Sequence, residues 1–178
     1  MAGLEGFEGS RIQGFQESRA QVKCQILLSG KVKQMSSESG KGYSQKQAPG
    51  TKLNPELAEE IKKRLRGGLL PCAVAFKIAK DMKIPPISVG QAADLLEVPL
   101  AKCQLGLFGY TPDKKIARAE TTTSQELLAA IRESMHNDRL ACEAAWQIAD
   151  RFKMTRLKVS NVCEGHEIKI KPCQLGAF

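Results

Sequence analysis

The chain contains one stretch of sequence twice. Residues 54–108 align with residues 124–178 without a gap at a constant offset of 70, and 16 of the 55 aligned positions are identical. The longest identical run, Cys-Gln-Leu-Gly, stands at 103–106 and again at 173–176. Because two copies are too few for an open repeat array, the alignment predicts two copies of one small domain that act as a pair.

The size and composition of each copy restrict its architecture. A domain as short as one copy buries a small share of its surface, so we expect the two copies to pack together. Aromatic residues make up only 5% of the 178-residue chain, and Ala, Leu, Ile, Lys and Glu dominate the two copies. This composition favours helices over a β-sandwich or a β-barrel.

Each copy opens with the signals of a helix. Asn54 suits an N-cap and Pro55 suits the first helical position, and Ser124 takes the capping place in the second copy. Apolar residues then recur every four positions, at Leu57, Ile61 and Leu65 in the first copy and at Leu127, Ile131 and Met135 in the second. Gly67 and Gly68 are expected to stop the first of these helices, and Asn137 and Asp138 replace them in the second copy.

The rest of each copy predicts two more helices and a strand. A second helix is expected over about 71–82 and 141–152, and a third helix is expected to end near residues 97 and 167. Apolar and polar residues then alternate over 167–171 and, more weakly, over 98–102, which is typical of a strand. Three helices followed by a strand is the order of a reduced winged helix.

Five positions around the corner between the second and third helices share one pattern in the two copies. They are Ala79, Lys83, Ile84, Val89 and Ala92 in the first copy, and Ala149, Lys153, Met154, Val159 and Val162 in the second. This spacing resembles the helix-turn-helix of bacterial and archaeal DNA-binding regulators, in which a small residue lets the two helices cross closely. The two lysines depart from the family, where Gly usually adopts the left-handed turn, so the turn is expected to differ.

The resemblance implies both a fold and a function. The fold is mainly α, with two tandem trihelical helix-turn-helix units that each end in a short C-terminal strand, in the manner of a winged helix. The implied function is binding of double-stranded DNA by a transcriptional regulator. A covalently linked pair of units would then read two half-sites about one helical turn apart.

The two copies differ in the side chains that DNA would contact. A DNA-reading helix needs polar groups for base edges and cations for phosphates. The second copy supplies such residues on its third helix and final strand: Arg156, Lys158, Ser160, Asn161, Lys169 and Lys171. The third helix of the first copy offers Ser88 and Gln91 without a basic residue, so the second copy is the better candidate. The net charge of +8 supports this only weakly, since residues 1–53, with 8 basic and 4 acidic groups, carry half of it.

Paired cysteines suggest an alternative function. Cys72 matches Cys142 and Cys103 matches Cys173, so the duplication repeats two thiols. The alternative is a protein-interaction or metal- or redox-responsive module on a helix-turn-helix scaffold, in which Cys72 and Cys142 have lowered pKa values at helix starts. No Cys-x-x-Cys pair occurs, so buried packing is the expected role of these cysteines and no cofactor is expected.

An enzymatic function is not expected. The only two histidines, His136 and His166, have no counterpart in the other copy. The sequence also has no phosphate-binding loop, nucleophile elbow or dinucleotide fingerprint.

These patterns divide the chain into four segments. Residues 1–53 are expected to form a disordered basic tail, 54–109 the first unit, 110–123 a linker and 124–178 the second unit. A chain that begins at Met35 would still contain both units. The sequence shows no stretch of about 20 apolar residues and no secretory signal, so no membrane association and a cytoplasmic location are expected. Association of several chains into a homo-oligomer is compatible with the sequence.

Overall fold

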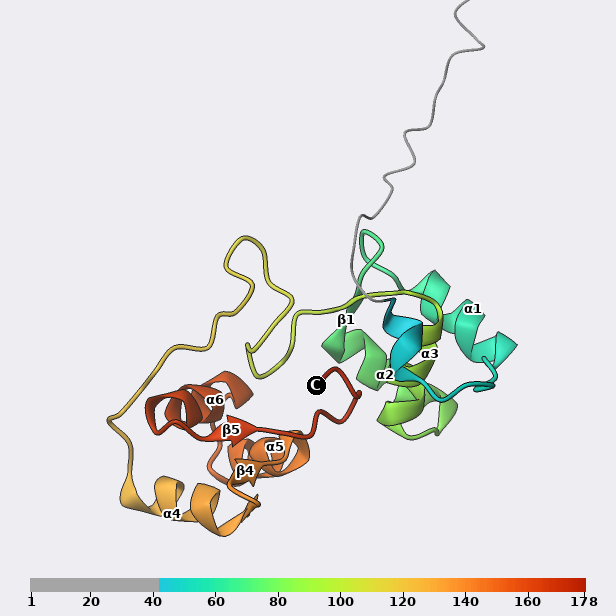
Figure 1. The fold of residues 1–178 in the computed structure, drawn as a ribbon. Helices are drawn as coiled ribbons and strands as arrows, with labels where there is room; N and C mark the ends of the chain where they lie inside the picture. Colours follow the sequence, from blue (N-terminus) through green and yellow to red (C-terminus); the bar gives the residue numbers. More distant parts are fainter. Residues whose placement is uncertain (1–41) are drawn as a thin grey trace, which may run out of the picture. The chain divides into compact units, whose positions relative to one another are not determined.

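The computed structural model describes residues 42–178, which are mainly helical (Figure 1). The helices of the first copy, here called repeat one, are α1 (Pro55–Lys63), α2 (Cys72–Met82) and α3 (Pro86–Leu95). Those of repeat two are α4 (Gln125–Glu133), α5 (Cys142–Arg151) and α6 (Arg156–Gly165). Three helices per repeat and their order confirm the mainly α prediction. Within 42–178, no helix is long and apolar enough to cross a bilayer.

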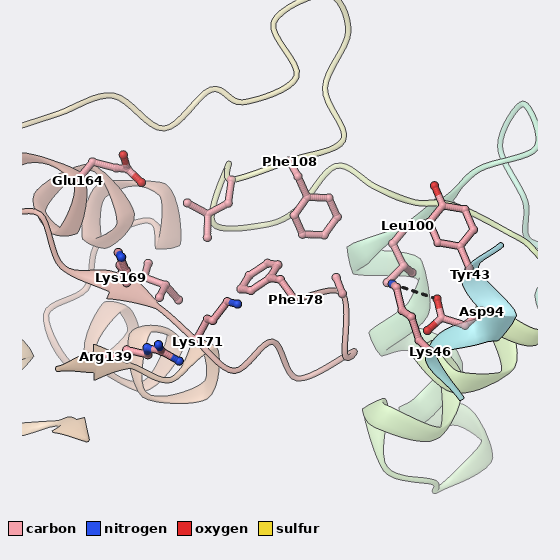
Figure 2. Close-up of a pocket in the computed structure, with 13 residues that line it drawn as sticks. Tyr43, Lys46, Asp94, Leu100, Phe108, Arg139, Glu164, Lys169, Lys171 and Phe178 are labelled. Atoms are coloured by element: carbon pink, nitrogen blue, oxygen red, sulfur yellow. Dashed lines mark ion pairs between the residues drawn. The ribbon is translucent and has the colours of Figure 1, made fainter. Parts of the chain in front are cut away.

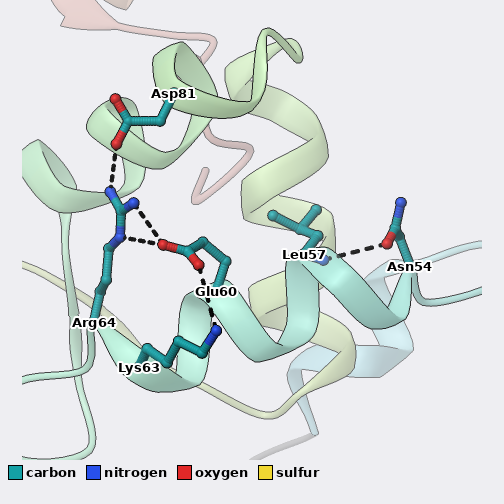
Figure 3. Close-up of polar contacts among 6 residues, drawn as sticks. All are labelled: Asn54, Leu57, Glu60, Lys63, Arg64 and Asp81. Carbon is teal, nitrogen blue, oxygen red and sulfur yellow. Dashed lines mark hydrogen bonds and ion pairs between the residues drawn. The ribbon is translucent and has the colours of Figure 1, made fainter.

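The first helix of each repeat begins where the sequence predicted and ends earlier. The Asn54 side chain accepts a hydrogen bond from the Leu57 amide at 3.2 Å (Figure 3) and another from the Glu56 amide at 2.9 Å, as expected of an N-cap. Helix α1 ends at Lys63 and α4 at Glu133, so Leu65 and Met135 lie beyond the helices. Both side chains still pack against the cores of their repeats.

A tight hairpin follows each first helix and explains its early end. Gly67 and Gly68 have φ angles of 57° and 77°, and Asn137 and Asp138 have φ angles of 50° and 58°. Two successive positive φ angles define the type I′ turn, whose twist matches that of paired strands. In repeat two the turn joins β3 (Met135–His136) to β4 (Arg139–Leu140), and in repeat one it joins the bridged residues 66 and 69.

Ion pairs fix the end of α1 against α2. The Arg64 guanidinium donates to the Glu60 carboxylate one turn earlier, at 2.7 Å, and to the Asp81 carboxylate on α2, at 2.8 Å (Figure 3). These groups are partly exposed, so the network contributes modestly to stability and mainly sets the position of the helix end.

The short strands at the ends of the repeats are present. Strand β2 (Leu100–Ala101) pairs in parallel with β1 (Leu70–Pro71), and β5 (Lys169–Ile170) pairs in parallel with β4. Each final strand therefore returns beside the strand that precedes the second helix. Among the strands that residues 42–178 form, β3 and β4 pair in antiparallel fashion as a hairpin. This hairpin lies before α5 rather than after α6.

Lysines adopt the left-handed turn between the second and third helices. Lys83 has a φ angle of 55° and Lys153 one of 53°. In repeat one the amide of Ile84 donates to the Ala79 carbonyl at 3.0 Å and the Lys83 amide donates to the Lys80 carbonyl at 3.2 Å, the two bonds of a Schellman motif. The expectation of a different turn was therefore wrong, because these hydrogen bonds hold the backbone left-handed although the residue is not glycine.

Replacement of these lysines by glycine should stabilise the protein. Lys83→Gly and Lys153→Gly remove the Cβ that makes the left-handed conformation costly, and each is expected to raise the free energy of unfolding by roughly 0.5–1 kcal/mol. Urea denaturation measures the change. Lys80→Gly, at an exposed position inside α2, is the matched control and should destabilise by about 1 kcal/mol. A loss of stability in Lys83→Gly and Lys153→Gly would contradict this account of the turn.

The two repeats complete each other's cores. Leu105, at the end of repeat one, is 1% exposed and lies in the core cluster of repeat two, whereas Leu175, at the end of repeat two, is 1% exposed and lies in the core cluster of repeat one. Both belong to the repeated Cys-Gln-Leu-Gly run. This exchange confirms that the repeats pack together and shows that neither has a complete core of its own.

Equivalent aromatic residues meet where the repeats join. The rings of Phe76 and Trp146, which are 70 positions apart, have centroids separated by 4.3 Å. Phe108 and Phe178, another pair at this offset, meet edge to face at 5.7 Å. Contact between equivalent residues is the mark of a twofold relation, so the duplicated chain behaves as a covalently linked pseudo-dimer.

Part of the segment expected to be disordered is ordered. Residues 43–46 form the 3₁₀-helix η1 (Tyr43–Lys46), and the amides of Tyr43 and Ser44 donate to the Glu97 carboxylate at 2.8 and 3.0 Å. Lys46 forms an ion pair with Asp94 at 3.5 Å. The prediction of disorder was therefore wrong for residues 42–53, because acidic groups of repeat one hold them. Residues 1–41 lie outside the described part of the chain.

Candidate functional site

The linker before repeat two covers the outer side of α6. Lys158 forms an ion pair with Glu120, and the Asn161 side chain accepts a hydrogen bond from the Arg118 amide at 3.0 Å. The Asn161 carbonyl accepts another from the Glu120 amide at 3.0 Å, and a side chain at Gly165 would collide with the Glu120 backbone. Two of the residues predicted to read DNA, Lys158 and Asn161, therefore hold the linker in this structure.

Arg156 is occupied by one contact within repeat two and one contact with repeat one. Its guanidinium lies 3.4 Å from the centroid of the Trp146 ring, and it also donates to the Gln104 side chain, which belongs to repeat one. A guanidinium over an indole face makes a favourable cation–π contact. Arg156 is half-buried by these partners, so it stabilises the junction rather than presenting a free cation.

Ser160 cannot contact DNA in this structure. Its side chain is 0% exposed and its Oγ has no hydrogen-bond partner among the described residues. The equivalent residue in repeat one is Gly90, where a side chain would collide with the Leu175 carbonyl. The prediction of Ser160 as a contact was therefore wrong, because this position of the third helix faces the protein interior.

The third helix of repeat one is covered in a similar way. Gln47 donates to the Asp94 side chain at 2.9 Å, beside the Lys46 ion pair, so the segment preceding repeat one lies against α3. Of the two predicted contacts on this helix, Gln91 is exposed and Ser88 is half-buried. With no cation on α3, neither residue has a phosphate-binding neighbour on that helix.

Three cations of repeat two remain exposed on its strands. Lys169 and Lys171 follow the same face of β5 and its continuation, and Arg139 on β4 is the register partner of Lys169. Among residues 42–178, none of the three lies within ion-pairing distance of a carboxylate. We call Arg139, Lys169 and Lys171 the basic cluster. Arg139 was not among the residues predicted from the sequence, although the Asn137-Asp138 turn signal could have placed it on a strand.

A cavity of about 580 Å³ lies beside the basic cluster (Figure 2). Its apolar lining includes Leu100, Leu107, Phe108, Ile170, Ala177 and Phe178, which are three equivalent pairs from the two repeats. Two acids also line it, and both are paired: Asp94 with Lys46 and Glu164 with Lys115. The basic cluster therefore supplies the unpaired charge of the cavity.

The paired cysteines are buried thiols. Cys72, Cys103 and Cys142 are all buried, and Cys173 is half-buried. Burial raises the pKa of Cys72 to about 12 and also raises the pKa of Cys142, so the predicted lowering at helix starts was wrong. Among residues 42–178, no three His, Cys, Asp or Glu side chains come together as a metal site. The metal-binding alternative for Cys72, Cys103, Cys142 and Cys173 therefore has no geometric support.

The buried thiols should make stability fall at high pH. Burial raises the pKa of Cys72 and of Cys163 from 9.0 to about 12. Above pH 9 the unfolded chain loses these protons while the folded chain keeps them, so stability is lost as pH rises between 9 and 12. The two thiols together should cost roughly 3 kcal/mol on going from pH 8 to pH 10.

Urea denaturation at the two pH values measures this loss. Cys72→Ala/Cys163→Ala is the control, and its loss between pH 8 and pH 10 should be smaller by that amount. An equal loss in the variant and in the original protein would show that other groups cause the pH dependence.

Comparisons with protein-family models, with curated proteins and with solved structures find no match to this chain.

Proposed function

We propose that this protein binds double-stranded DNA and acts as a regulator, and that the basic cluster of repeat two makes the main contact. The observation that carries the proposal is the register pairing of Arg139 with Lys169, with Lys171 on the same face and without carboxylate partners in residues 42–178. Like charges on paired strands repel one another. An anionic partner such as the DNA backbone would relieve this repulsion and release counterions.

The cluster is specific to repeat two. The equivalent positions of repeat one are Leu69, Pro99 and Ala101, which carry no charge. This asymmetry argues against the prediction that both repeats read DNA as a symmetric pair. One chain would present one DNA-binding surface. Two half-sites would then require two chains.

Burial and turn geometry in each repeat favour a helix-turn-helix arrangement, which supports the proposal. Three of the small and apolar positions of the pattern are buried in each repeat: Ala79, Val89 and Ala92 in repeat one, and Ala149, Val159 and Val162 in repeat two. The apolar turn residues Ile84 and Met154 are half-buried. The left-handed turn residue also matches the family's geometry, at Lys83 and Lys153. We propose that both repeats are helix-turn-helix units of a reduced winged-helix type, with β2 and β5 in the place of the wing.

The linker that lies against α6 changes the kind of DNA contact that we expect. Lys158 and Asn161 hold the linker, so base edges would be read by α6 only after residues 115–120 leave it. In the structure as it stands, the exposed cations can reach phosphates. We therefore expect binding that is dominated by the DNA backbone and only weakly dependent on sequence.

Fluorescence anisotropy with the full chain and a labelled 20-base-pair duplex of random sequence tests the proposal. Three phosphate contacts predict that log affinity falls against log salt concentration with a slope of about −2.7 or steeper. No binding at low salt would contradict DNA binding and favour the protein-interaction alternative. Binding independent of salt would contradict contact of the basic cluster with phosphates.

A further inference from the structure

The cavity between equivalent residues of the two repeats has the properties of a small-molecule site. Its volume of about 580 Å³ is in the range of ligand pockets, which are mostly apolar with a few placed polar groups. Figure 2 shows Phe108 and Phe178 in the middle of the lining, with the basic cluster gathered on one side. The cavity therefore offers an apolar surface next to concentrated positive charge.

The charge of the lining is unequal between its two sides. Asp94, from repeat one, is paired with Lys46, and Glu164 is paired with Lys115, so neither acid is free to neutralise a neighbour. The basic cluster comes from repeat two alone, and the apolar lining comes from both repeats. A ligand that matches this arrangement has an apolar body and an anionic group at one end.

We propose that this cavity binds an amphipathic organic anion, such as an aromatic or medium-chain carboxylate. The apolar body lies against Leu100, Phe108, Ile170 and Phe178, and the anionic group lies among Arg139, Lys169 and Lys171. Charge-assisted hydrogen bonds to a carboxylate are stronger than neutral ones, and the guanidinium can bind both of its oxygens. Because the anion binds the basic cluster, it would compete with DNA for that cluster. Only this competition depends on the proposed DNA binding; binding of the anion itself does not.

Binding can be measured with the full chain and without DNA. The probe is 8-anilinonaphthalene-1-sulfonate, an aromatic anion whose fluorescence rises in an apolar site. Saturable binding of one probe per chain is expected, with displacement by decanoate. Decanol has the same chain length without the charge and should displace the probe at least about tenfold less well, since it leaves the cluster unneutralised.

Two variants separate the contributions of charge and of cavity. Arg139→Gln/Lys169→Gln/Lys171→Gln should weaken decanoate binding at least about tenfold and leave decanol unchanged, because it removes only charge. Ala177→Trp places a large ring in the lining and should weaken both competitors while the basic cluster stays intact. Thermal denaturation of each variant checks that it is folded.

The outcomes are distinct. No saturable probe binding, equal displacement by decanol and decanoate, or unchanged decanoate affinity in the charge variant would each overturn the proposal. Probe binding with the expected pattern in a protein that fails to bind DNA would support the ligand site and contradict the proposed function alone. Where both hold, decanoate should lower DNA affinity.

Discussion

Leu175→Ala is expected to lower the free energy of unfolding by about 3 kcal/mol and to loosen repeat one rather than repeat two. Buried leucine-to-alanine changes cost roughly 2–5 kcal/mol, through lost transfer energy and the cavity left behind. Leu175 is almost fully buried, and the core that it fills belongs to α1, α2 and α3. Leu175 therefore belongs to repeat two in sequence and fills the core of repeat one in structure.

Urea denaturation and hydrogen exchange test this prediction together. Denaturation gives the size of the loss, and exchange shows where protection falls, which should be at the amides of α2 and α3. Leu69→Ala is the matched control, because Leu69 is 40% exposed and its loss should stay within about 0.5 kcal/mol. A small cost of Leu175→Ala, or a loss of protection confined to repeat two, would contradict the exchange of core residues.

Arg139→Gln/Lys169→Gln/Lys171→Gln should reduce affinity for duplex DNA by about a hundredfold or more at 0.1 M salt. Each lost phosphate contact removes about 0.9 from the slope of log affinity against log salt, so the slope should become shallower by about 2.7. Fluorescence anisotropy over a salt titration measures both quantities in one experiment. The remaining slope reports contacts made by other basic residues of the chain.

A charge-matched control separates the cluster from the net charge. Lys62→Gln/Lys63→Gln/Lys80→Gln removes the same three charges from exposed positions on α1 and α2. This variant should keep affinity within about threefold of the original, because screening limits the reach of exposed charges to about 10 Å at 0.1 M salt. Equal losses in the two variants would show that DNA responds to net charge rather than to the basic cluster.

The second and third helices could be predicted from the sequence because their signals are local. Apolar and small residues recur at helical spacing, and each helix ends at a position that the structure shows to be a hydrogen-bonded cap. The hairpins were missed because Leu65 and Met135 continue the spacing of the first helix. The pairs Gly67-Gly68 and Asn137-Asp138 were interpreted as helix stops, whereas both are also signals of a type I′ turn.

The candidate site could be predicted only in part, because its geometry depends on contacts between distant residues. Lys158 and Glu120 are 38 positions apart, and nothing in the local sequence shows that they meet. Ser160 is buried because of the way the third helix packs. A polar residue is usually exposed, so the sequence alone did not indicate this burial. Lys169 and Lys171 were identified from their charge, whereas Arg139 joins them through a strand register that becomes visible only in the structure.

The exchange of Leu105 and Leu175 between the two cores could not be predicted from the sequence for the same reason. The repeated Cys-Gln-Leu-Gly run predicted a shared structural role at each repeat's end, and the structure shows such a role. Which core each leucine fills depends on the relation between the repeats. Leu105 and Leu175 have identical local sequences and lie in opposite cores, so local pattern alone could not assign them.

Chemical-shift mapping is the most direct test of the central claim, that the basic cluster of repeat two binds DNA. ¹H–¹⁵N spectra of the full chain would be recorded as a 16-base-pair duplex is added. The account predicts that the largest shifts occur at the amides of β4, β5 and Lys171, while α3 of repeat one stays unchanged. Unperturbed spectra, or shifts centred on repeat one, would contradict it.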